Sequence, residues 1–442
     1  MNLSQFMGSV CLFLGINQLS AQSVDSEALR YEQSQVLFQD DIHTIHIHLN
    51  SQTFDKIVNE DACKEDRMYG HVKEFRLNNQ QVQLNNVGMR VRGNTSCANF
   101  KKQYKIKFTE DELFENSGQM MNFSEEQVEQ IKSQRLLGLK SISLRASAND
   151  STILRDKLST ELFNQATSAS REQGMEGTPV NGGMTYRVGF TRLFVKFDSG
   201  TYQDFGLYNI TENVDREFVK LRYPKPARGH LFKSNIGKAD LTVGSESINH
   251  YEPKMLDGKK AKDDEKAIEI LKQLTNQIAS AKSREDLAQF IDVDNFLNYI
   301  AISSFVGHWD SLIGNANNDY LFFNKETQKW QVFVWDLDNT FGITFAGYNT
   351  YNANLNEILV NGKNIIKESN RPLFYKILNL YSEEYNEKVD NLLETTFQEE
   401  KVQNRIINLR NMFTGGHSSE EKWESLFRFK NARHKKALQF VQ

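Results

Sequence analysis

Proline and long apolar stretches are scarce in this chain of 442 residues. Only 5 Pro occur, which argues against Pro-rich linkers between its parts. Beyond the amino-terminal segment, no apolar stretch reaches the length that a helix needs to cross a bilayer, so we expect no transmembrane span. An excess of positive charge is also lacking, because 53 Lys and Arg face 57 Asp and Glu. This balance argues against a partner that is nucleic acid bound through bulk charge.

Several motifs that mark well-known active sites are absent as well. The chain contains neither G-x-x-x-x-G-K-[ST] nor G-x-G-x-x-G, the glycine-rich loops that hold phosphates. It also lacks the G-x-S-x-G turn of serine hydrolases and the Cys/His spacings of zinc sites. P-loop enzymes, serine hydrolases and structural zinc proteins are therefore disfavoured.

The amino-terminal segment has the character of a signal peptide. Residues 6–16 are apolar and are followed by the small residues Ser20 and Ala21, which suit cleavage by a signal peptidase. The segment carries no Lys or Arg before its apolar run, and the alternative is a buried first helix. We predict a signal peptide over residues 1–21 and an exported protein, either secreted, periplasmic or at the cell surface.

Cysteine is rare, with three residues in the whole chain. Cys11 lies inside the predicted signal peptide, which leaves Cys63 and Cys97 in the mature protein. A pair of cysteines in an exported protein is typical of a disulfide, so we expect a bond between these two residues. The alternative is two unrelated buried thiols.

The hydrophobic pattern predicts an α+β fold with two unlike parts. Alternating apolar and polar residues indicate strands at residues 40–50, 72–77, 87–92, 104–108, 193–197 and 205–210. After residue 253 the apolar period becomes helical, as in residues 262–282 and 292–305, with one hairpin at 320–335. We expect only helices from residue 354 onward. The predicted parts are a β-rich one over residues 22–255 and a helical one over residues 256–442.

Two histidines, His46 and His48, alternate with apolar residues in the first predicted strand. Both would lie on the same face of the strand, because side chains alternate with a period of two. They could bind one metal ion, but the pattern favours positions on the solvated face.

Four polar residues around the predicted hairpin have the order of a phosphoryl-transfer site. Asp310 and Asn315 have the spacing of the protein-kinase loop H-R-D-x-x-x-x-N, in which Asp accepts the hydroxyl proton and Asn holds magnesium. Asp336 follows the hairpin, where a second metal-binding Asp is needed, and Asp338 stands two residues on. The alternative is a buried cluster of Asp side chains that cap turns.

The same segment also fits D-x-D-x-[TV], the nucleophile strand of haloacid-dehalogenase-type phosphatases, in which the first Asp attacks phosphate. That fold needs a further acidic metal site on a later strand. After Asp338 only Asp390 remains among the aspartates, within a helical pattern. The phosphatase interpretation is therefore the weaker one.

The chain resembles the CotH family of spore-coat kinases and surface proteins, which have an atypical protein-kinase fold. The resemblance rests on motifs spread over most of the chain. They are Val91-Arg-Gly-Asn-Thr-Ser96, Lys101-Lys-Gln-Tyr-Lys-Ile-Lys-Phe108, Ile153-Leu-Arg-Asp-Lys-Leu158, Gly206-Leu-Tyr-Asn-Ile-Thr-Glu-Asn-Val-Asp215, His230-Leu-Phe-Lys233, Trp309-Asp310 with Asn315, Trp335-Asp-Leu-Asp-Asn-Thr-Phe-Gly342 and Phe427-Arg-Phe-Lys-Asn-Ala-Arg433.

This resemblance implies a cleft that binds ATP with Mg²⁺ or Mn²⁺, between a β-rich amino-terminal lobe and a helical carboxy-terminal lobe. In that cleft Asp310 would be the catalytic base. Asp336 would be the main metal ligand, with Asn315 and Asp338 in support.

The resemblance also implies cations in the first lobe that contact the phosphates. Arg92, Lys102, Lys105 and Lys233 are the candidates, and Glu212 would orient such a lysine. Lys102 and Lys105 could instead be solvated side chains of a basic strand. The Gly-rich loop of ordinary kinases is missing, and backbone N–H groups after Arg92 would do part of its work.

Two functions follow from these expectations. The first is an exported kinase that transfers the γ-phosphoryl group of ATP to Ser or Thr of secreted or surface proteins. The alternative is a non-catalytic surface, coat or adhesion protein of the same family, in which the acidic cluster no longer acts.

Overall fold

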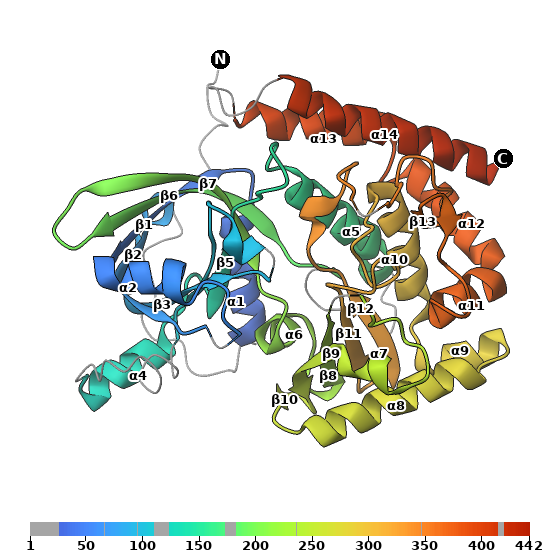
Figure 1. Cartoon of the computed structure of the whole chain (residues 1–442), viewed down its shortest axis with the longest axis horizontal. Helices are drawn as coiled ribbons and strands as arrows, with labels where there is room; N and C mark the ends of the chain where they lie inside the picture. Colours follow the sequence, from blue (N-terminus) through green and yellow to red (C-terminus); the bar gives the residue numbers. More distant parts are fainter. Residues whose placement is uncertain are drawn as a thin grey trace, which may run out of the picture.

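The computed structural model describes residues 26–65, 67–94, 96–109, 123–172, 183–235, 237–345, 347–413 and 420–442. The predicted signal peptide, residues 1–21, lies outside these residues, as does Thr95 of the first family motif. Figure 1 shows a β-rich part on the left and a largely helical part on the right. The predicted α+β class, with strands first and helices later, is confirmed.

The amino-terminal part is built around a closed barrel of seven strands in the order β1-β2-β3-β4-β5-β7-β6. Strands β1 and β6 close the barrel as a parallel pair, and the other neighbours are antiparallel. Alternate residues of β1 are buried, so that Ile45, Ile47 and Leu49 face the barrel core. The barrel strands are β1 (Ile42–Leu49), β2 (Gly70–Leu77), β3 (Val82–Arg92), β4 (Gln103–Lys107), β5 (Ser141–Arg145), β6 (Val188–Phe197) and β7 (Tyr202–Glu212).

His46 and His48 lie on the outer face of β1, as their alternation with apolar residues predicts. The His46 ring stacks on Phe194 with 5.0 Å between ring centroids, and its Nδ1 lies 2.9 Å from Asn78 Nδ2. His48 Nε2 lies 2.7 Å from the backbone oxygen of Asp198. These neighbours give both histidines structural partners on the barrel surface.

A second sheet, in the order β10-β9-β8-β11-β12, joins segments that are far apart in the chain. Strand β8 lies before residue 255 and pairs antiparallel with β11, which lies after it. The division at residue 255 therefore runs through one sheet, and the two parts share this layer. The strands are β8 (Arg228–Ser234), β9 (Tyr251–Leu256), β10 (Lys259–Lys260), β11 (Tyr320–Asn324) and β12 (Lys329–Phe333).

Helices make up most of the carboxy-terminal part and pack around the second sheet in one large apolar core. Among the described residues, no helix combines the length and apolar character needed to span a bilayer. The helices are α1 (Ser26–Ser34), α2 (Ser51–Asp55), α4 (Glu125–Ser133), α5 (Arg155–Glu172), α6 (Arg216–Arg222), α7 (Ser245–Asn249), α8 (Asp264–Ser280), α9 (Arg284–Phe290), α10 (Val293–Val306), α11 (Pro372–Leu380), α12 (Ser382–Glu394), α13 (Glu399–Asn411) and α14 (Glu420–Val441).

The expectation of helices alone from residue 354 onward is wrong. Strands β13 (Leu359–Val360) and β14 (Lys363–Asn364) form a small antiparallel ribbon there. Asn361 and Gly362 turn the chain between them with positive φ angles of 49° and 74°. Such left-handed angles suit Asn and Gly and do not continue a helix. The helices resume at Pro372, where the fixed φ of proline suits a first helical position.

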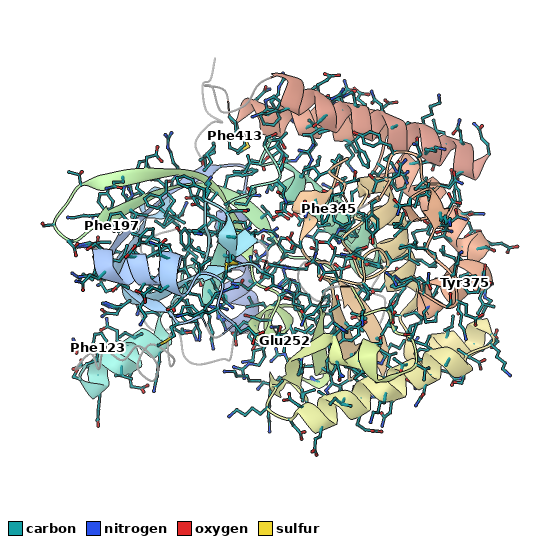
Figure 2. All side chains as sticks on the ribbon, in the orientation of Figure 1. Phe123, Phe197, Glu252, Phe345, Tyr375 and Phe413 are labelled. Carbon is teal, nitrogen blue, oxygen red and sulfur yellow. A yellow bond between two sulfur atoms is a disulfide. The ribbon has the colours of Figure 1, made fainter. Side chains whose placement is uncertain are left out.

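The carboxy-terminal helices are fastened to the barrel side by polar and aromatic contacts. Arg405 of α13 forms ion pairs with Asp40, just before β1, and with Glu161 of α5. Phe413, which follows α13 and is labelled in Figure 2, packs its ring edge-on against Phe190 of β6 with 5.0 Å between the ring centroids. The two parts are therefore held together at points well separated from the shared sheet in the chain.

Cys63 and Cys97 form a disulfide in the structure, with 5.4 Å between their Cα atoms. Cys97 lies in the turn after β3, and Cys63 lies in the loop before β2. The bond therefore ties the turn that follows Arg92 to a separate segment of the barrel.

We predict that reducing this bond lowers the free energy of unfolding by about 3–4 kcal/mol, because the bond closes a loop in the unfolded chain. Urea denaturation of the oxidised protein and of the Cys63→Ser/Cys97→Ser double variant measures the difference. Peptide mapping without reductant must recover one peptide that links both cysteines, and two free thiols in protein from an oxidising compartment would contradict the bond.

Candidate functional site

A cleft of about 410 Å³ lies between the barrel and the helical part, within the range of about 300–1,000 Å³ that is usual for ligand pockets. Strands β3 and β4 and the turn after β3 line one side, and the segments after α10 and β12 line the other. Cationic side chains outnumber carboxylates in the described lining. The cations are Arg67, Arg90, Arg92, Lys105, Arg145, Lys233 and Lys254, and the carboxylates are Asp215, Asp310, Asp336 and Asp338.

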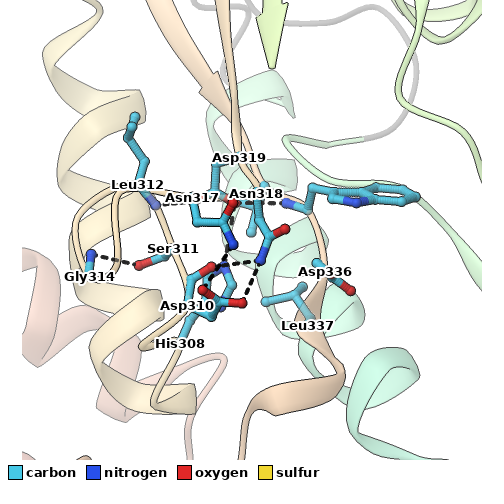
Figure 3. A network of polar contacts seen from close by, with 12 residues as sticks. His308, Asp310, Ser311, Leu312, Gly314, Asn317, Asn318, Asp319, Asp336 and Leu337 are labelled. Carbon is cyan, nitrogen blue, oxygen red and sulfur yellow. Dashed lines mark hydrogen bonds and ion pairs between the residues drawn. The ribbon is translucent and has the colours of Figure 1, made fainter. Parts of the chain in front are cut away.

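The buried carboxylate of Asp319 organises the helical side of this cleft (Figure 3). Its Oδ2 accepts hydrogen bonds from the Tyr299 hydroxyl at 2.6 Å and from the Leu312 backbone N–H at 2.9 Å. Its Oδ1 accepts from the Trp335 backbone N–H at 2.9 Å and lies 3.4 Å from His308 Nε2. Asp319 thus connects α10, the loop that carries Asp310 and the turn that carries Asp336. Nothing in the local sequence pattern distinguished it.

Asp310 lies in the cleft, surrounded by three asparagine amides. Asn315 and Asn317 donate their Nδ2 groups to Asp310 Oδ1 at 2.9 and 3.0 Å, and Asn318 donates to Oδ2 at 2.9 Å. Burial raises the pKa of Asp310, and the amides of Asn315 and Asn317 oppose that shift. The carboxylate is therefore held in one orientation by neutral donors, without a cation against it among the described ion pairs.

Asn315, which the resemblance predicts to support a metal ion, forms a hydrogen bond with Asp310. Its amide nitrogen donates to that carboxylate, and its Oδ1 lies 3.5 Å from the Tyr348 hydroxyl. The chain turns sharply directly after Asn315, where Ala316 and Asn318 take positive φ angles of 49° and 66°. Asn315 remains in the cleft lining, 5 residues from Asp310 in sequence.

Asp336 and Asp338 leave β12 in a tight turn and both face Arg145, the last residue of β5. Arg145 Nη2 forms an ion pair with Asp336 Oδ1 and lies 2.8 Å from Asp338 Oδ2. Its Nη1 lies 3.5 Å from Asp156 Oδ2, a third carboxylate that accepts a hydrogen bond from the Tyr186 hydroxyl. Sequence reasoning missed Arg145, because it is 191 residues away from Asp336 and belongs to no motif.

The two carboxylates of this turn respond differently to their surroundings. Burial raises the pKa of Asp338 to about 7, against the opposing charge of Arg145. Burial also acts to raise the pKa of Asp336, but Arg145, Arg92 and Lys233 outweigh it and hold that pKa below its usual value. The Asp336 side chain is 29% exposed, against 8% for Asp338, so it is the more accessible of the two.

The cations of the cleft repel one another. Burial and the neighbouring Arg145 lower the pKa of Arg92 to about 10, and its guanidinium lies 5.1 Å from the Trp335 ring centroid. Burial, Lys254 and Arg92 lower the pKa of Lys233 to about 8. A polyanion in the cleft would relieve this repulsion, since opposite charge favours the protonated form of each group.

Two of the predicted residues do not face the cleft. Lys102 donates its Nζ to the backbone oxygen of Cys97 at 2.8 Å, and it is not part of the cleft lining. Glu212 is buried between Arg187 and Arg222, each of which donates two hydrogen bonds to its carboxylate. Two arginines therefore stand where a lysine partner of Glu212 was expected, and all three side chains are buried inside the protein.

The carboxylates of the cleft can be compared with the ligands that a divalent metal ion requires. Among the described residues, no group of three or more His, Cys, Asp or Glu is arranged to enclose a metal ion. Asp336 and Asp338 supply two carboxylates at the cleft wall. Mg²⁺ is commonly bound by one or two carboxylates together with substrate phosphates, so these residues fit an ion that enters with a nucleotide.

We predict that Asp319→Asn lowers the free energy of unfolding by at least about 2 kcal/mol, because an amide nitrogen would then face a buried donor. Urea denaturation measures this change. Asp390→Asn, an exposed position on α12, is the matched control and should leave stability unchanged. Equal stability of the two variants would show that the Asp319 contacts contribute little.

Comparison with known proteins agrees with these features. The family model described as CotH kinase protein matches residues 89–439. Inner spore coat protein H of Bacillus subtilis (strain 168) is 22% identical over 256 residues, which cover 54% of this chain and 64% of that protein. The alignment thus spans less than two thirds of this relative. Because the family model covers most of the sequence, the resemblance predicted from the motifs is confirmed, and the chain belongs to the CotH kinase family.

Proposed function

We propose that this protein is an exported kinase that transfers the γ-phosphoryl group of ATP to Ser or Thr of secreted or surface proteins. The observation that carries the proposal is the placement of Asp310 and Asp336 in one cation-rich cleft. In a kinase-like arrangement, residues 22–255 would act as the amino-terminal lobe and residues 256–442 as the carboxy-terminal lobe. Membership of the CotH kinase family and the Cys63–Cys97 disulfide support activity and export, respectively.

Asp310 has the properties of a general base for a hydroxyl group. Amide groups orient its carboxylate, and no cation pairs with it among the described contacts. Burial raises its pKa, which increases its tendency to accept a proton. An acceptor hydroxyl placed against Asp310 would lose its proton to this carboxylate as the new bond to phosphorus forms.

Asp336 and Asp338 would hold Mg²⁺ or Mn²⁺, which when bound neutralises charge on the phosphate oxygens. Arg92, Lys105 and Lys233 would face the phosphates from the other walls of the cleft. None of these cations reaches Asp310 in the described ion pairs. The base and the phosphate-binding charges are therefore separate parts of the same cleft.

The turn after Arg92 takes the place of a glycine-rich loop in this proposal. Gly93 has φ +98°, and a Cβ at this position would lie 2.0 Å from Ser96 Oγ. Only glycine fits there without a shift of Ser96, so the chain can turn tightly beside the cleft. Asn94, Ser96 and Asn99 line the cleft within this turn and offer polar groups to a phosphate.

One observation favours the non-catalytic alternative. Arg145 already pairs with Asp336 and Asp338, as expected for a cluster that only stabilises the fold.

The phosphatase interpretation gains no such support, because the described chain after Asp338 forms one short ribbon and helices α11 to α14. It therefore lacks a later strand of the kind that would carry a second acidic metal site.

We predict that Asp310→Ala lowers the rate of phosphoryl transfer at least about 100-fold and leaves nucleotide affinity nearly unchanged, because the base does not hold the phosphates. Transfer from γ-labelled ATP to casein or to the protein itself measures the rate, and calorimetry measures affinity.

Asp336→Asn should instead lose both metal-dependent nucleotide binding and transfer, while Asp390→Asn should keep both. Loss of nucleotide binding in Asp310→Ala but not in Asp336→Asn would reverse the two roles. If neither substitution changed any transfer, the alternative without catalysis would replace the kinase.

We further predict that nucleotide affinity falls as the pH rises above about 8, the pKa of Lys233. Below that pH the ammonium is charged and attracts phosphate; above it, nucleotide binding must take up a proton, so affinity drops by up to about 10-fold for each pH unit. Calorimetry with Mg²⁺ and a non-hydrolysable ATP analogue between pH 7 and pH 9 tests this. Lys233→Met should bind more weakly at pH 7 and lose the pH dependence, whereas a parallel fall in both proteins would assign it to another group.

A further inference from the structure

Arg145 is the most heavily engaged cation of the cleft. Its side chain is 3% exposed, it ends strand β5, and it contacts the carboxylates of Asp156, Asp336 and Asp338. It nevertheless lines the cleft, so its guanidinium forms part of the wall that faces a ligand.

Arg145 offsets the negative charge of the carboxylates around it. Three carboxylates meet one guanidinium, and two of them are the candidate metal ligands. Carboxylates at such close quarters repel one another unless a cation lies between them. Arginine keeps its charge at every physiological pH, and its fork can bind two carboxylates at once. Arg145 thus supplies to Asp336 and Asp338 the positive charge that a divalent ion would supply.

Arg145 also has donor atoms that neither Asp336 nor Asp338 uses. Its Nε and Nη1 atoms are buried and have no hydrogen-bond partner among the described residues, although Nη1 is within ion-pair distance of Asp156. Asp156 is fully buried and is not part of the cleft lining, so it can hold the guanidinium at the wall when other partners change. Asp336 and Asp338 both use Nη2, so a phosphate oxygen that replaced them would take over this donor while Nη1 stays beside Asp156.

We propose that Arg145 is a positioning residue that holds Asp336 and Asp338 together until a nucleotide brings its metal ion, and then binds the phosphates. The inference rests on the proposed function and names a residue that the sequence motifs do not include. A divalent ion alone must displace Arg145 from Asp336 and Asp338, which leaves Asp156 as its one remaining carboxylate among the described ion pairs. An ion that arrives with a nucleotide brings phosphate oxygens to receive the guanidinium, so the two bind cooperatively.

The test measures Mn²⁺ binding by electron paramagnetic resonance, with and without a non-hydrolysable ATP analogue. In the wild-type protein the analogue should tighten Mn²⁺ binding at least about 10-fold. In Arg145→Gln, Mn²⁺ alone should bind at least about 10-fold more tightly than in the wild type, and the analogue should add less than about 3-fold. Lys102→Gln removes a nearby cation that does not face the cleft and should behave as the wild type.

Arg145→Gln leaves three carboxylates without their cation, so its fold is checked by thermal denaturation. Arg145→Lys keeps the charge but cannot bridge two carboxylates, and should shift Mn²⁺ binding in the same direction by a smaller factor. Mn²⁺ binding by Arg145→Lys that equals the wild type, with the analogue still binding, would overturn the role of Arg145 alone. A wild-type protein that binds no analogue with Mn²⁺ would overturn the kinase proposal together with it.

Discussion

One buried carboxylate, that of Asp319, determines where the acidic residues of the cleft can lie. It accepts backbone N–H groups from Leu312 and Trp335, which belong to separate segments, and the hydroxyl of Tyr299 on α10. Neither Leu312 nor Trp335 lies in a helix or strand, so these bonds satisfy backbone N–H groups that no regular hydrogen-bond ladder would satisfy. The separation between Asp310 and Asp336 thus depends on one side chain that does not itself line the cleft.

The cleft around these segments is electrostatically strained. Burial and neighbouring cations lower the pKa values of Arg92 and Lys233, because both oppose a positive charge. Burial raises the pKa of Asp338, because it opposes a negative charge. Charges arranged this way destabilise the fold by themselves, and such shifts are concentrated at sites that bind or react. The proposed ligand, an anionic nucleotide with its metal ion, would relieve these interactions because it brings opposite charge to both kinds of group.

Local pattern was enough to predict six of the seven barrel strands, because alternation is a short-range signal, but it missed β5, the strand that ends in Arg145. The spacing of Asp310, Asn315 and Asp336 also singled out three residues that line one cleft. The closure of the barrel, the sheet shared across residue 255 and the partner of Asp336 depend on contacts between distant segments. Arg145 reaches Asp336 across 191 residues, and no local period records such a pair. The partners of Glu212 could not be predicted for the same reason, since Arg187 lies just before β6 and Arg222 ends α6.

The disulfide gives the cleft a dependence on its surroundings. Cys97 lies in the same turn as Asn94, Ser96 and Asn99, which line the cleft, and Cys63 anchors that turn to another part of the barrel. A thiol pair of this kind becomes a covalent tether only where the medium is oxidising. The turn that forms one wall of the cleft therefore keeps its covalent tether only in an oxidising medium, and in a reducing one it would be held by non-covalent contacts alone.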